Sequence, residues 1–74
     1  MAGSFAGTAM LLDVWFCRHK GETWFSFATP GDAPMSAPRK GSVEYVFAWM
    51  RKRGYTVAQV GIADKDMLGI EYYG

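Results

Sequence analysis

The sequence has few of the features that point to a particular class of protein. It contains one cysteine in 74 residues, which excludes an internal disulfide and with it the disulfide-stabilised class of small secreted domain. A reducing, cytoplasmic location is the expectation that follows. Eight lysines and arginines against seven aspartates and glutamates leave a net charge of +1, so no overall field draws the chain to nucleic acid or to anionic lipid.

Long apolar runs and phosphate-binding glycine patterns are also missing. The opening stretch MAGSFAGTAMLL has neither a positively charged flank nor a long apolar run, so we expect neither a signal peptide nor a membrane span there. None of the nine glycines stands in the spacing of a phosphate loop or of a dinucleotide fingerprint. We expect residues 1–9 to be a frayed N-terminal segment and residues 10–74 to form a single domain.

What the sequence does have is apolar and aromatic surface. Half of the residues are hydrophobic and 16% are aromatic, whereas 20% are charged, a composition typical of a packed globular domain rather than of a disordered chain. The three tryptophans, five phenylalanines and four tyrosines are more than one small core can hide. We therefore expect some aromatic side chains to lie on the surface.

Two segments rich in aromatic and β-branched residues, 11–18 and 22–29, predict a β-hairpin. Between them Lys20 and Gly21 favour a two-residue primed turn, which sets His19 opposite Glu22 and fixes every further cross-strand pair. One predicted face is apolar and pairs Phe16 with Phe25, Val14 with Phe27 and Leu12 with Thr29. The opposite face pairs Cys17 with Trp24, Trp15 with Ser26 and Asp13 with Ala28.

Residues 42–54 are the best helix candidate. Ser42 suits the N-cap and Gly54 the C-terminal cap, and the basic residues 51–53 suit the negative end of the helix dipole. The predicted core stripe consists of Val43, Val46, Phe47 and Met50. Tyr45 and Trp49 fall on a second, half-exposed flank. The preceding residues 29–41 hold three prolines and two glycines and predict a connecting loop.

The remaining residues, 55–73, alternate like a second hairpin with its tip at residues 64–66. That turn sets Ile62 opposite Leu68, Val60 opposite Ile70 and Ala58 opposite Tyr72. The predicted order is therefore β-β-α-β-β, an α+β fold in which one helix packs on one face of an antiparallel sheet of two hairpins. The other face of the sheet is expected to stay uncovered.

Candidate catalytic and metal-binding residues are sparse. Cys17 and His19 are two apart on a predicted strand and so share a face, but no third group, oxyanion hole or pocket accompanies them. A structural zinc site needs more ligands than this pair supplies. The stretch DKDMLG resembles the start of a calcium loop, but its fifth position is Leu68 and the closing glutamate is missing. We expect no enzyme activity, no metal and no cofactor.

Binding to another protein is the function that the composition favours most. The predicted open face carries Trp15, Trp24 and Tyr73 among polar residues, and the helix flank carries Tyr45, Trp49 and Arg53. Aromatic and arginine anchors within polar surroundings are typical of protein interfaces. The expected partner is a protein, and a homodimer is one form of this binding, because two-fold pairing is the commonest way to cover an exposed face or sheet edge.

Single-stranded nucleic acid, in particular RNA, is the alternative partner. The two outward tryptophans and Tyr73 could stack unpaired bases, and the basic residues 39–40 and 51–53 could meet phosphates. Asp13 and Glu71 on the same predicted face oppose this interpretation. In size and composition the chain is similar to small phage and mobile-element proteins that inhibit a host machine, anti-CRISPR proteins among them. That resemblance implies an inhibitor that occupies a surface of its target.

Overall fold

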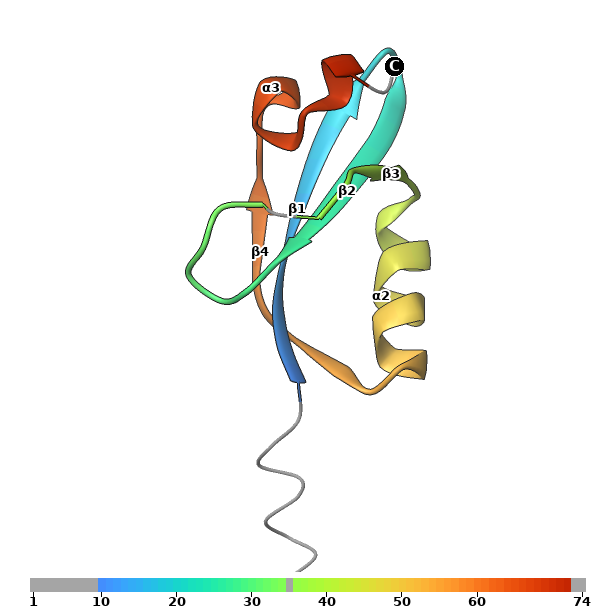
Figure 1. The fold of residues 1–74 in the computed structure, drawn as a ribbon. Coiled ribbons are helices and arrows are strands. Elements are labelled where there is room, and N and C mark those ends of the chain that lie inside the picture. Colours follow the sequence, from blue (N-terminus) through green and yellow to red (C-terminus); the bar gives the residue numbers. More distant parts are fainter. Residues whose placement is uncertain (1–9, 35, 73–74) are drawn as a thin grey trace, which may run out of the picture.

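The computed structural model describes residues 10–34 and 36–72 as a small α+β domain. A four-stranded mixed sheet carries helix α2 on one face and two short helical turns, α3 and η1, on the other (Figure 1). The elements in chain order are β1 (Met10–His19), β2 (Glu22–Ala28), β3 (Arg39–Lys40), α2 (Val43–Lys52), β4 (Tyr55–Ile62), α3 (Lys65–Leu68) and η1 (Ile70–Tyr72). The strand order is β3-β2-β1-β4.

The first hairpin forms in the predicted register. His19 lies opposite Glu22, and the pairing continues without a shift to Asp13 opposite Ala28. At the turn, Lys20 and Gly21 have φ angles of 53° and 76°, the positive pair that a type I′ turn requires and that matches the right-handed twist of the strands. A two-residue turn thus sets which side chains face the helix.

Helix α2 begins and ends where its capping residues predict. The Ser42 hydroxyl accepts a hydrogen bond from the Tyr45 amide at 3.1 Å, and Gly54 follows the helix with a φ of 80°. The predicted core stripe needs one correction, because Val43 is 42% exposed at the start of the helix. The first core cluster joins Val46 and Met50 to Val14, Phe16 and Phe25, with Phe47 and Trp49 partly buried at its sides.

The predicted second hairpin is wrong. Strand β4 pairs in parallel with β1, from Met10 opposite Tyr55 to Phe16 opposite Ile62, and the residues after it form α3 and η1 instead of a return strand. β3 runs antiparallel to β2 and therefore in the same direction as β1, so a crossover from β3 through helix α2 enters the sheet parallel to both strands and pairs with the free edge of β1. Gly69, with a φ of 71°, ends α3 as a left-handed cap.

The face of the sheet expected to be open is covered. A second core cluster joins Ala63, Leu68 and Ile70 of the C-terminal segment to Cys17 and Trp24 on the outer face, with Trp15 packed against it. Ile70 is fully buried there. Since a hairpin would have left these aromatic side chains in water, burial of outer-face surface favours the folded-over segment.

The loop after β2 is held by polar contacts. Asp13, buried in β1, accepts a hydrogen bond from the Gly31 amide at 2.8 Å. Farther along, the Ser36 hydroxyl accepts one from the Phe27 amide at 2.7 Å, and the Ser36 amide donates to the Phe27 carbonyl.

None of the helices in the described part of the chain is long and apolar enough to cross a lipid bilayer.

Candidate partner-binding surfaces

The sheet-face anchors predicted from the sequence do not form an open surface. Trp24 is 5% exposed, and Trp15 is half-buried across from Gly61, whose backbone leaves room for the indole. The indole N–H groups of both tryptophans are buried without a hydrogen-bond acceptor among the described residues. Tyr73 lies outside the described residues. In this arrangement Trp15 and Trp24 offer a partner little aromatic surface.

The helix-flank anchors are brought together in part. The Arg53 guanidinium lies 4.2 Å from the centre of the Trp49 indole, a cation–π contact. Phe27 and Tyr55 stack on the same indole, with ring centres 5.4 and 5.9 Å away. Tyr45 is 54% exposed one turn earlier, so it is the free member of this set. Trp49 is thus held in place by its neighbours and partly buried against the first core cluster, so it is not a freely exposed anchor.

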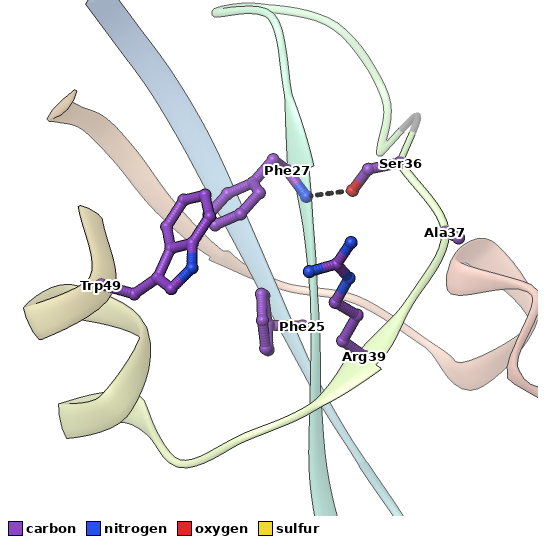
Figure 2. A pocket seen from close by; sticks show the side chains of 6 residues that line it. All are labelled: Phe25, Phe27, Ser36, Ala37, Arg39 and Trp49. Carbon is purple, nitrogen blue, oxygen red and sulfur yellow. Dashed lines mark hydrogen bonds between the residues drawn. The ribbon is translucent and has the colours of Figure 1, made fainter. Parts of the chain in front are cut away.

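A small hollow opens beside Trp49. Its volume is about 150 Å³, and we call it the aromatic pocket. It is lined by Phe25, Phe27, Ser36, Ala37, Arg39 and Trp49. Figure 2 shows Trp49 and Arg39 reaching it from opposite sides, with the two phenylalanine rings between them. No pattern in the sequence points to this pocket, because its lining joins three separate segments of the chain.

The outer edge of β4 is the second surface that sequence reasoning missed. β4 is the last strand of the sheet, and its eight residues, YTVAQVGI, include no charged residue and no proline. Val60 is 50% and Ile62 80% exposed. The predicted hairpin places these two side chains in an apolar core. Their exposure becomes visible only once β4 is seen to pair with β1 at the edge of the sheet.

The chain was also compared with protein-family models, with curated proteins and with solved structures. None of the three comparisons gives a match. The surfaces themselves therefore carry the functional argument.

Cys17 lies in an environment that suppresses thiol reactivity. It belongs to the second core cluster, and its Sγ lies 3.5 Å from the Arg18 carbonyl oxygen. Burial, and secondarily the charge of Asp64, raises the pKa of the Cys17 thiol, whereas a nucleophilic cysteine needs a lowered pKa. In the described residues no three histidine, cysteine or acidic side chains gather into a group that could hold a metal ion.

Proposed function

We propose that this protein is a non-enzymatic protein-binding module that pairs with a second copy of itself through the edge of β4. The observation that carries the proposal is an uncharged, proline-free edge strand of eight residues with two exposed aliphatic side chains. Such an edge offers a row of unpaired backbone N–H and C=O groups to another strand. Its occupant in this proposal is the β4 strand of the second copy, running antiparallel.

The opposite edge of the sheet provides a contrast within the same molecule. There β3 is two residues long, consists of Arg39 and Lys40, and follows a proline. Short length, positive charge and proline are the usual means by which proteins prevent strands from adding to an edge. β4 is long, uncharged and free of proline, so of the two edges it is the one more open to pairing.

The side chains of β4 have a two-fold pattern that suits pairing with an identical strand. A β-bulge leaves Ala58 without a partner in β1, because Leu12 pairs with Val57 and the next residue of β1 pairs with Gln59. The bulge reverses the alternation of faces at the middle of the strand. The residues on the helix side of the sheet are consequently Tyr55, Val57, Val60 and Ile62, two on each side of the bulge.

Antiparallel pairing centred between Ala58 and Gln59 brings like faces together. Val57 then lies opposite Val60 of the second copy, and Tyr55 lies opposite Ile62, each pair occurring twice about the two-fold axis. All four of these pairs are apolar and on the helix side, and no like charges meet. About eight backbone hydrogen bonds would join the two strands and extend the sheet to eight strands.

The test is the mass of the chain in solution as a function of concentration. Light scattering should report twice the chain mass at micromolar to millimolar concentration and a return to the single mass on dilution. Val60→Lys should leave the circular dichroism spectrum unchanged and give a monomer, because it places a charge opposite Val57. Met67→Lys is the matched control: Met67 is 51% exposed on α3, away from the edge, and its variant should still dimerise.

Cysteine crosslinking tests the register. In a Cys17→Ser background, a mixture of Val57→Cys and Val60→Cys chains should form the mixed disulfide faster than either chain forms a disulfide with itself. A wild-type chain that keeps the single mass at every concentration contradicts self-association. A Val60→Lys variant that dimerises as well as wild type, or preferential Val60→Cys homodisulfide, contradicts pairing at this edge or in this register.

The RNA-binding alternative receives less support, because its stacking platform was the outer face, where Trp24 is buried. Inhibition of a host protein stays a prediction. It would require that a surface of this kind also binds a target protein.

A further inference from the structure

We propose that the aromatic pocket is a binding site for a small aromatic carboxylate, a single ring that carries one carboxylate group. This inference concerns the edge of the sheet opposite β4 and does not depend on dimer formation. Four properties of the pocket lead to it: the way in which the backbone opens it, its size, the chemistry of its lining and its single cation.

The pocket exists because the chain bulges away from β2. The amide of Ser36 donates to the carbonyl of Phe27, and Arg39 pairs with Phe25. Two steps along β2 are therefore matched by three steps along the partner segment, through Ala37 and Pro38. Proline has no N–H to donate to the ladder, so the segment arches outward at this point. The arch leaves the phenylalanine rings of the core accessible from the side.

The size and lining of the pocket select one unsubstituted ring. Its volume of about 150 Å³ equals that of an engineered protein cavity that binds benzene. Apart from Arg39 and the indole N–H of Trp49, its one polar side-chain group is the Ser36 hydroxyl, which already bonds to the Phe27 amide and to Ser26. A nucleobase would leave its own polar edge atoms without partners in this lining, which disfavours it. A hydrocarbon ring needs none.

The charge at the pocket selects a single carboxylate. No hydrogen bond or ion pair engages the Arg39 side chain within the described residues, and no acidic side chain lines the pocket. A planar guanidinium matches one carboxylate through two parallel hydrogen bonds. A doubly charged phosphate is less suitable, because Arg39 is the one cationic side chain in the lining and would leave part of that charge unpaired.

The wall formed by Trp49 is already in place. Phe27, Tyr55 and Arg53 hold the indole from several directions, so a ligand would not have to order it. The lining of the pocket includes no residue of β4, although Tyr55 at the start of β4 stacks on Trp49. Self-association through β4 would leave it open.

The experiment compares phenylacetate with phenylacetamide, its neutral isostere, by amide and indole chemical shifts in NMR titrations. We expect phenylacetate to bind with a dissociation constant on the order of millimolar, as suits a ligand of about ten heavy atoms, with shifts centred on Phe27, Ser36 and the Trp49 indole. The amide should bind about tenfold more weakly, because it cannot form the charge-assisted pair with Arg39.

Two kinds of variant test separately what the ring and the charge of the ligand contribute to binding. Arg39→Gln should reduce phenylacetate binding by about tenfold and make the acid and the amide equal, whereas Arg18→Gln, an exposed arginine elsewhere on the sheet, should change neither. Ala37→Leu, which fills the pocket, should weaken both probes. Folding of each variant is checked by its amide spectrum.

Four results would overturn the proposal. The first is equal binding of acid and amide by the wild-type chain, and the second is an acid preference that survives Arg39→Gln. The third is tighter binding of adenosine monophosphate than of phenylacetate, which would assign the pocket to nucleotides. Absence of any shift at the pocket with millimolar phenylacetate counts against the proposal in the same way.

Discussion

Replacing two isoleucines by alanine, one at a time, tests the C-terminal half of the fold. Ile70 is fully buried beneath the outer face of the sheet, whereas Ile62 is 80% exposed at the edge of β4. The substitution is chemically identical at both positions. In a second hairpin the two side chains would share one apolar core face, so both changes would destabilise.

The structure predicts very different magnitudes for the two changes. Ile70→Ala leaves a cavity between the C-terminal segment and the outer face, and such a change lowers the free energy of unfolding by about 2 to 5 kcal/mol. For a domain of this size that corresponds to a fall in melting temperature of roughly 10 to 30 °C. Ile62→Ala removes little buried surface from the single chain, so its effect should stay within about 0.5 kcal/mol.

The assay is urea unfolding followed by circular dichroism and by tryptophan emission. It should be run at a concentration where light scattering gives the single-chain mass, because dimer formation would add to the apparent stability. Ile70→Ala should also shift tryptophan emission to the red, since Ile70 and Trp24 share a core cluster. Comparable losses in both variants, or no loss at Ile70, would refute the folded-over C-terminal segment.

Two further predictions concern the outer face. Because the pKa of the Cys17 thiol is raised, its stabilising contribution is fully present below the ordinary thiol pKa of 9.0 and is lost as pH rises past that value. Cys17→Ser should remove this part of the pH dependence. The check is the unfolding free energy of both chains measured across that pH, and parallel curves would contradict the prediction. A β-carbon at Gly61 would lie 2.5 Å from Cζ3 of Trp15, so Gly61→Ala should destabilise by about 1 to 3 kcal/mol. The exposed Thr56→Ala on the same strand is its control in the same melts, and an equal effect in the two variants would show that the indole moves aside without strain.

Local signals in the sequence determined the parts of the fold that depend on neighbouring residues. Lys20 and Gly21 fixed the hairpin register, because a two-residue turn leaves no freedom in the pairing that follows. Ser42 and Gly54 fixed the ends of α2, because capping satisfies backbone groups within one turn of the helix. Val14, Phe16 and Phe25 of the hairpin and Val46 and Met50 of the helix stripe form the first core cluster as predicted, whereas the predicted pair of Leu12 with Thr29 does not form, because β2 ends at Ala28.

Only the tertiary structure decided the second half of the chain. The alternation of residues 55–62 predicts a strand but contains no information on its direction or neighbour, since parallel and antiparallel strands show the same period. The apolar residues Leu68 and Ile70 suit a strand as well as the two short turns that they form. The outer face of the hairpin selects the turns, because packing them there buries its tryptophan side chains.

The candidate sites depend on the same long-range choices. Once β4 pairs with β1, Val60 and Ile62 lie at an open edge, and the side-chain pattern around the bulge becomes two-fold. The aromatic pocket requires β2, the segment at Pro38 and the last turn of α2 to meet, which no local pattern encodes. The sequence by itself determined turns, caps and apolar faces, because these obey short-range geometry. The packing of distant segments decided which faces are covered, because burial is a property of the whole chain.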